Sequence, residues 1–261
     1  MKTTDELMRL AEECRKEYEN PDSLAHGWGH VKRTAEGAVW FMEKAGGTER
    51  EQQLAFAAGL LHDIKRKKFE SVSHAISGSE KVAEILDKYA FADKEINDIV
   101  IAIRDHRDIN KWENNVHQSA YFSDKVFELM GAYMDFRGPF WVGEKFDVKY
   151  KDTDTKPLEA LLILYEKAKN KIFVPDKYPD FARGLVNYQI GWNSEFNEGL
   201  KDNENWAVEM GIEMFEHGRK RIDFEEVILN YESKNSKQRE WTKEMQDYIK
   251  GKKFSEFDNL L

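Results

Sequence analysis

The sequence predicts an all-α fold, and three observations support that prediction. Apolar residues recur at intervals of three and four along most of the chain, which is the spacing of one face of an amphipathic helix. No segment sustains the alternation that is typical of a half-buried strand. Short runs rich in Gly, Pro and Asn separate the periodic stretches. Together these features favour a bundle of helices.

The first half of the chain contains five expected helices. The first lies between the breakers "ENPDS" and "KAGGT" and is defined by the stripe Val31, Ala35, Ala38, Met42 and Ala45. Residues 54–64, "LAFAAGLLHDI", are apolar on most sides, as expected of a central buried helix. Three more helices are expected on the apolar stripes within residues 72–89, 96–103 and 116–134.

The second half is expected to begin with a break and then return to helix. The segment "FRGPFWVGEKFD" is expected to interrupt the helical pattern, and "KYKDTDTK", residues 149–156, to form a loop. A helix, a loop and a longer helix should follow as far as residue 200, and the highly charged remainder is again helical in pattern. We predict one domain over residues 1–200 and a helical extension over residues 201–261 that packs on it.

Composition limits the function. The formal net charge of −9, from 40 basic and 49 acidic residues, disfavours bulk nucleic-acid binding. No apolar run approaches the roughly 18 residues of a membrane span, and the charged N-terminus lacks the apolar core of a signal peptide. The single cysteine, Cys14, fits a reducing compartment. We therefore expect a soluble cytoplasmic protein without membrane partners, whose C-terminal helices could cover a pocket or form a homodimer.

Several polar residues occupy positions that the helical pattern places inward. His62 and Asp63 end the most apolar helix, His106 follows Ile103 by three residues, and Asp124 lies on the fifth stripe. A buried carboxylate is costly unless a partner or a metal compensates its charge. Each residue alone could be a hydrogen-bonded core residue or half of a buried ion pair. Four such residues on three expected helices favour a divalent metal site with nitrogen and oxygen ligands.

The N-terminal ligand is expected to be His30, which opens the helix that carries the first stripe. His26 lies four residues earlier, but Gly27 and Gly29 make a continuous helix there unfavourable. His26 is therefore expected to support the ligands from outside or to face a substrate.

These residues carry a family resemblance. His30 in "HGWGHVKRT", the His62–Asp63 doublet in "LLHDI" and Asp124 in "FSDKV" resemble the H…HD…D signature of HD-domain metal-dependent phosphohydrolases. The segments "HAISGSEKVAEIL", "IVIAIRDH" and "SDKVFELMGAYMDFRGPFWVGE" are also similar to helices of that family. The resemblance extends over residues 22–200, and the remaining residues match no pattern.

The resemblance implies an HD-domain helical bundle, with additional C-terminal helices, around one divalent metal ion. The implied ligands are His30, His62, Asp63 and Asp124, and the ion could be Mn, Fe, Zn, Mg, Co or Ni. Some branches of the superfamily hold a second metal on two further histidines, whose positions match His74 and His106. Without a second ion, these two would bind phosphate or support the metal-activated water.

The reaction implied is attack of a metal-activated water on a small phosphate ester, most simply a nucleotide or related phosphomonoester. Asp63 would be both ligand and general base. Lys65 and Arg66 follow the doublet after Ile64, and Lys65 is expected to reach the phosphate. Arg137 is the second candidate for that contact. Lys67 and Lys68 are expected to be solvated.

Two other functions are compatible with this pattern. Some relatives with binuclear HD-like sites carry out iron-dependent oxygenation, which would require bound iron and consume oxygen. A catalytically silent ligand-binding or regulatory domain could keep the same fold. The complete ligand set favours the hydrolase.

Overall fold

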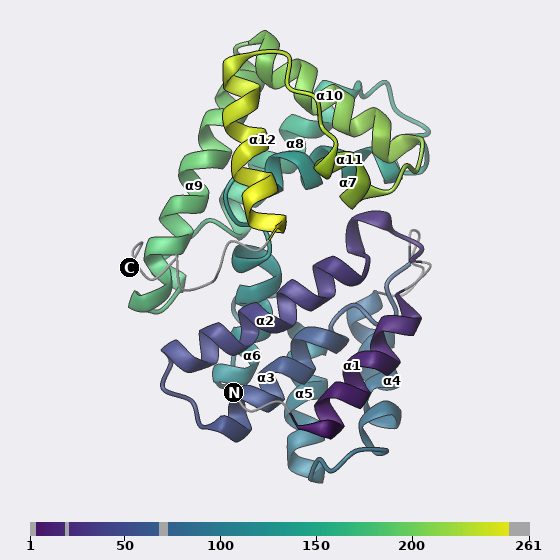
Figure 1. Ribbon diagram of the computed structural model, residues 1–261, viewed down its shortest axis with the longest axis vertical. Coiled ribbons are helices and arrows are strands. Elements are labelled where there is room, and N and C mark those ends of the chain that lie inside the picture. The colour runs from purple at the N-terminus through teal and green to yellow at the C-terminus, as the bar shows by residue number, and fades with distance from the viewer. Residues whose placement is uncertain (1–3, 19–20, 68–72, 251–261) are drawn as a thin grey trace. The chain divides into compact units, whose positions relative to one another are not determined.

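The computed structural model describes residues 4–18, 21–67 and 73–250, and all regular structure in these ranges is helical (Figure 1). These ranges hold twelve α-helices, two 3-10 turns and one π-helical turn. The all-α prediction is confirmed. Within the same part of the chain, no helix is both long enough and apolar enough to cross a membrane.

The chain folds as two compact units, residues 1–128 and 129–261. The helical segments of the first unit are α1 (Asp5–Glu17), η1 (Leu24–His26), α2 (Trp28–Lys44), α3 (Glu49–Leu61), α4 (His74–Leu86), α5 (Asp93–Asp105), α6 (Asn115–Phe122) and the π-turn η2 (Ser123–Phe127). Those of the second are α7 (Tyr133–Lys149), α8 (Pro157–Lys171), η3 (Pro175–Lys177), α9 (Asp180–Lys201), α10 (Asn205–Arg219), α11 (Phe224–Leu229) and α12 (Ser236–Ile249). Along the chain, the boundary between the two units falls after residue 128. It therefore lies within the stripe at residues 116–134, which the sequence predicted to be one helix. The division into a domain and an extension at residue 200 stays a prediction.

Helices α2 and α3 lie side by side in the centre of the first unit (Figure 1). Helix α3 begins with a capping box, in which the Thr48 backbone N–H donates to Glu51 at 2.7 Å and the Glu51 backbone N–H donates to the Thr48 hydroxyl at 3.3 Å. The predicted break "KAGGT" precedes it, and Gly46 there has a φ of +74°, which glycine adopts without steric cost. These signals fix where α2 ends and α3 starts.

The two helices approach most closely at Gly59. A Cβ on Gly59 would lie 2.6 Å from the Ala35 Cα and 3.0 Å from the Thr34 carbonyl oxygen, both backbone atoms of α2. The neighbouring apolar residues, including Val31, Ala58 and Leu61, are buried in one core cluster. The absence of a side chain at this crossing lets the ends of α2 and α3 come together, next to His30 and His62.

Helix α7 corrects one expectation. The segment "FRGPFWVGEKFD" continues the helix instead of breaking it, although Pro139 within it cannot donate to the carbonyl four residues earlier. Packing against α10 explains the difference. A Cβ on Gly143 would overlap the Phe215 carbonyl oxygen, and one on Gly218 would overlap that of Phe140. Gly143, one of the two glycines that suggested a loop, is therefore a contact point of two closely packed helices.

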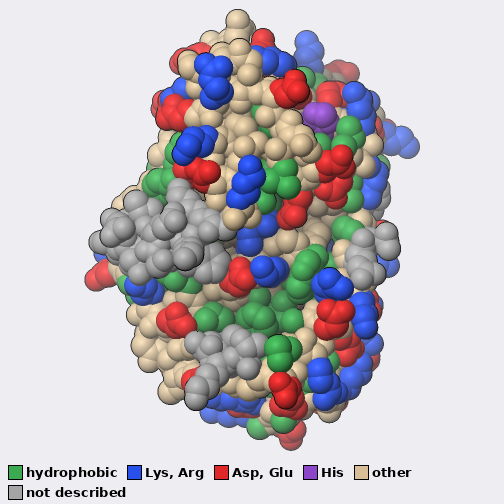
Figure 2. Space-filling view, viewed as in Figure 1, with side chains coloured by type: hydrophobic (Ala, Val, Ile, Leu, Met, Phe, Trp, Pro, Cys, Tyr) green, Lys and Arg blue, Asp and Glu red, His purple; other side chains and the backbone are tan. Residues whose placement is uncertain are grey.

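Charged side chains at the surface are of mixed sign. On the face shown in Figure 2, Lys and Arg side chains lie among Asp and Glu side chains. Ion pairs such as Arg50–Glu95 and Lys201–Glu166, each 2.6 Å long, join the two kinds. Exposed pairs of this type stabilise a fold by only about 0–1 kcal/mol each, so the apolar cores account for more of the stability.

The second unit buries a carboxyl group. Asp135 is fully buried, and its Oδ2 accepts a hydrogen bond of 3.2 Å from the Trp241 indole N–H. Burial raises the pKa of Asp135 well above its usual value, because ionisation in the interior is unfavourable. Asp135 therefore keeps its proton in the folded protein under conditions in which an unfolded chain would lose it.

We predict that Asp135→Asn raises the free energy of unfolding at pH 7, by on the order of 1–3 kcal/mol. Asn keeps the acceptor for Trp241 but has no proton to lose. Above the unfolded-state pKa of about 3.9, the native carboxyl binds more protons than the unfolded one, so wild-type stability falls as pH rises. Urea unfolding from pH 4 to pH 7 should show the gap between variant and wild type widening with pH. A gap that does not change with pH would contradict the prediction.

Candidate metal centre

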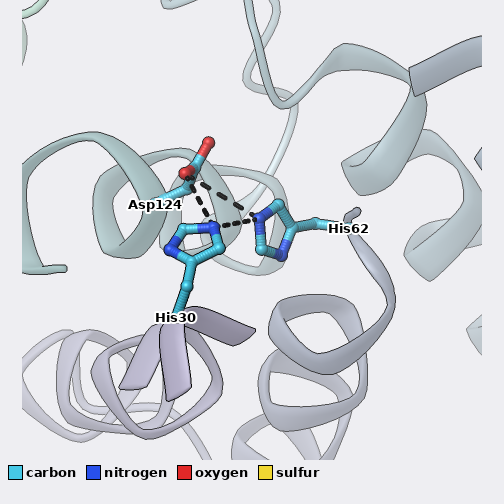
Figure 3. Close-up of side chains that lie close together, drawn as sticks. All are labelled: His30, His62 and Asp124. Carbon is cyan, nitrogen blue, oxygen red and sulfur yellow. Dashed lines mark hydrogen bonds and ion pairs between the residues drawn. The ribbon is translucent and has the colours of Figure 1, made fainter. Parts of the chain in front are cut away.

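The structure brings His30, His62 and Asp124 together in the first unit. His30 lies in the first turn of α2, His62 is the C-cap of α3, and Asp124 is in the π-turn η2. The His30 Nε2 lies 3.1 Å from the His62 Nε2, and the Asp124 Oδ1 lies 3.6 Å from the first and 3.8 Å from the second (Figure 3). All three side chains are buried.

Hydrogen bonds at the outer ring nitrogens set the tautomers of these two histidines. The His62 Nδ1 lies 2.7 Å from the Gly59 carbonyl oxygen, which can only accept, so Nδ1 carries the proton. The His30 Nδ1 lies 3.2 Å from Glu128 Oε1 and donates to that carboxylate. When both rings are neutral, each directs the lone pair of its Nε2 at the other ring. In that state two lone pairs 3.1 Å apart repel each other, and a bound cation between them would turn the repulsion into attraction.

A second group forms beside the first from Asp63, His74 and His106. The His74 Nε2 lies 3.1 Å from the Asp63 Oδ1 and 3.4 Å from the His106 Nε2. His106 is the C-cap of α5, and its Nδ1 donates to the Ile103 carbonyl at 2.5 Å. His62 and His106 are thus oriented in the same way, each by a carbonyl three residues earlier in the last turn of its helix.

Asp63 faces both groups. Its Oδ2 lies 3.6 Å from the His30 Nε2 and 3.5 Å from the His62 Nε2, and its Oδ1 faces His74. The same carboxylate pairs with Arg66, whose Nη1 lies 3.1 Å from Oδ1. Adjacent residues point about 100° apart on a helix, but α3 ends at Leu61. The turn that follows lets the His62 and Asp63 side chains converge.

The charges in this cluster suit a cation. Burial raises the pKa of Asp63, but the neighbouring Arg66 and His62 charges lower it further, so it lies well below its usual value. The pKa of Asp124 is lowered in the same way, by Lys125 and His62 against burial. Burial lowers the pKa of His106 to about 3. Ionised carboxylates and neutral imidazoles are the forms that coordinate divalent metals.

A cavity of about 210 Å³ opens beside Asp63. Its lining includes Tyr18, His26, Lys65 and Arg66. His26 is buried, and its Nδ1 lies 2.8 Å from the Ser23 hydroxyl oxygen. His26 thus lies at this cavity and outside both groups of ligand-type side chains, and its contact with a substrate stays a prediction.

The remaining expected cations are placed differently. Lys65 and Lys67 are exposed at the cavity rim, whereas Lys68 lies outside the described residues. Arg137 is buried in α7 of the second unit, so its contact with phosphate stays a prediction.

Glu128 is a component of the site that the sequence analysis missed. It is fully buried, accepts the His30 Nδ1–H and pairs with Arg33, whose Nε lies 3.1 Å from Oε2. Glu128 follows Asp124 by four residues, and the π-turn ends between them with the Glu128 N–H donating to the Ser123 carbonyl at 2.8 Å. The segment 124–128 therefore contacts both nitrogens of the His30 ring, with Asp124 near Nε2 and Glu128 at Nδ1. The four-residue spacing was the signal that could have identified Glu128.

We predict that Glu128→Gln weakens metal binding about 10- to 100-fold. Gln keeps an acceptor for the His30 Nδ1–H but removes the negative charge that increases the basicity of the ring and that pairs with Arg33. Chelator competition with Mn²⁺ should report the change. Glu36→Gln is the matched control, because Glu36 is a solvent-accessible carboxylate on α2 that pairs with Lys32. Equal affinities in the two variants would show that Glu128 does not support the ligand.

Comparisons with known proteins place this geometry in a family. A model of the HD domain matches residues 27–163, more than half of the 261 residues. Bacillus subtilis YpgQ in complex with ADP is similar in structure, with 17% identity, a TM-score of 0.51, and coverage of 76% of this chain and 99% of that chain. A Lactobacillus plantarum protein has 18% identity, a TM-score of 0.54, and coverage of 78% and 98%.

A predicted HD superfamily hydrolase from an uncultured Thermotogales bacterium has 21% identity, a TM-score of 0.47, and coverage of 76% and 91%. A search of curated protein sequences finds no match. The matched segment contains both groups of buried ligand-type side chains. The chain belongs to the HD-domain family.

Proposed function

We propose that this protein is a metal-dependent phosphohydrolase that cleaves a phosphate ester of a small molecule, with nucleotides or related phosphomonoesters as the substrate class. The observation that carries the proposal is the pair of adjacent buried groups, His30–His62–Asp124 and Asp63–His74–His106, whose donor atoms face inward. In a dry core, imidazole lone pairs that face one another are destabilising, whereas a divalent ion binds to them.

The residues present fit a site for two ions. His30, His62 and Asp124 would hold the first with Asp63 Oδ2, and His74, His106 and Asp63 Oδ1 would hold the second. This mixture of imidazole and carboxylate suits Mn, Fe, Co, Ni or Zn better than Mg, which prefers oxygen ligands alone. A bound ion supplies Lewis-acid chemistry and lowers the pKa of a water molecule towards neutrality.

Side chains at the cavity would accept the proton and bind the phosphoryl group. Asp63, which lies at the cavity wall, accepts the proton of the attacking water. Lys65 and Arg66, at the same cavity, neutralise the charge of the phosphoryl group. Arg66 also contacts both Asp63 and His74, the latter at 3.3 Å. A second cation would meet the charge of Arg66 there, so occupancy of the second group is expected to move this guanidinium towards the phosphate.

Two observations favour nucleotides as the substrate class. The family resemblance of the sequence implied them, and the Bacillus subtilis protein with the same fold was solved in complex with ADP. At 17% identity the likeness shows the fold alone, so the nucleotide is a hypothesis to test against other phosphomonoesters.

The test is elemental analysis of protein purified without chelator, followed by a phosphatase screen with each metal found. We expect one or two transition-metal ions per chain and release of phosphate from at least one nucleotide or sugar phosphate. Iron with oxygen consumption and no phosphate release would instead indicate an oxygenase. A full ligand set without metal or turnover would indicate a silent binding domain, and either result would overturn the proposal.

A further inference from the structure

Among the residues that the structure describes, the hydroxyl of Tyr18 has no hydrogen-bond partner, although it is buried. Tyr18 is the C-cap of α1, its side chain is 6% exposed, and it forms part of the wall of the cavity beside Asp63. A buried hydroxyl without a partner destabilises a fold, whereas Phe would fill the same space without that cost. The donor, which the described part of the chain leaves unpaired, therefore indicates a bound ligand as its partner.

The position of Tyr18 is fixed by the core. Leu10, Cys14 and Tyr18 follow one another at intervals of four along one face of α1, and all three belong to the core cluster of the first unit. A neighbouring side of α1 is tied to the turn after α4, where Glu13 accepts from Lys88 at 2.7 Å. The Tyr18 ring is thus held in the cavity wall by rigid packing.

The neighbouring carboxylate does not take up this donor. The Asp63 Oδ1 already faces Arg66 and His74, and its Oδ2 faces His30 and His62. A phenol keeps its proton at neutral pH and so offers an O–H bond to an acceptor in the cavity. The adjacent Lys65 and Arg66 make an anionic acceptor the favoured partner.

We infer that Tyr18 is a substrate-binding residue whose hydroxyl donates a hydrogen bond to a phosphoryl oxygen of the ester bound in this cavity, an inference that rests on the proposed function. Tyr18 precedes residues 27–163, the segment that matches the HD-domain model. The contact therefore comes from a helix, α1, that lies outside the matched segment.

The test uses full-length protein loaded with Mn²⁺ and inorganic phosphate as the probe. We expect Tyr18→Phe to weaken phosphate binding, measured by calorimetry, about 10- to 100-fold, because a hydrogen bond to a charged group is lost. The KM of a hydrolysed substrate should rise with it. The Tm should stay the same or increase, because the variant removes an unpaired buried hydroxyl.

The matched control is Tyr89→Phe. Tyr89 is also buried in the first unit, but its hydroxyl donates to Glu13 and does not line the cavity. Phosphate affinity should be unchanged in this variant.

Two results would overturn the inference about Tyr18 alone: wild-type phosphate affinity in Tyr18→Phe, or a Tm several degrees lower, which would make the hydroxyl structural. If wild-type protein binds metal but neither binds phosphate nor hydrolyses any ester, the proposed function fails and the inference fails with it.

Discussion

Asp63→Ala is expected to abolish metal binding in both groups and to reduce turnover by about 10³-fold or more, since a bound ion stabilises the transition state by several kcal/mol. Asp63 faces His30 and His62 with one oxygen and His74 with the other. Its removal takes a ligand from each group and leaves Arg66 without its carboxylate. His62→Ala should abolish turnover as well, but it removes a ligand from the first group only.

The two variants can be separated by metal content. Elemental analysis should find no ion in Asp63→Ala, whereas His62→Ala should retain part of the metal held by the second group. Circular dichroism should show unchanged helical content in both, because α2 and α3 are held by their apolar core. Asp87→Ala is the control, since Asp87 is an exposed carboxylate after α4 in the same unit. Retained hydrolysis in Asp63→Ala would refute the proposed site.

His106 and Asp124 could be predicted because their positions follow helix periodicity, whereas His74 was named only by the family resemblance. His106 was assigned inward from its spacing to Ile103, and Asp124 from its spacing to Ala120, and the structure buries both side chains. Periodicity reports which face of a helix is covered. It does not report what covers that face, so the pairing of His74 with His106 and the central place of Asp63 needed tertiary structure.

Tyr18 shows where that limit lies. Its spacing to Leu10 and Cys14 indicates an apolar stripe on α1, which predicts a core tyrosine and nothing more. Whether its hydroxyl meets a carbonyl, a carboxylate or a cavity depends on how α1 docks. Residues 136–147 show the converse case, because Gly and Pro are statistically breakers, whereas close contact between α7 and α10 requires small residues. Local preference was overridden there by packing.

Gly59→Ala is the second change with a large expected effect. The added Cβ would lie 2.6 Å from the Ala35 Cα and 3.0 Å from the Thr34 carbonyl oxygen, and backbone atoms cannot rotate away as a side chain can. Helix α2 must shift, and it carries His30. We expect the free energy of unfolding to fall by about 3 kcal/mol. Metal affinity should fall as well, because the Gly59 carbonyl that orients His62 moves with α3.

Gly191→Ala is the matched control, and its expected effect on the free energy of unfolding has the opposite sign. Gly191 lies within α9, is exposed, and has nothing within 4 Å of the position a Cβ would take. Alanine is favoured over glycine in a helix interior by about 1 kcal/mol, so this variant should be more stable than wild type with unchanged metal affinity. Urea unfolding and chelator competition on both variants measure the two effects. If Gly59→Ala were also stabilising, helix propensity would outweigh the contact, and α2 and α3 could not be packed as closely as His30 and His62 require.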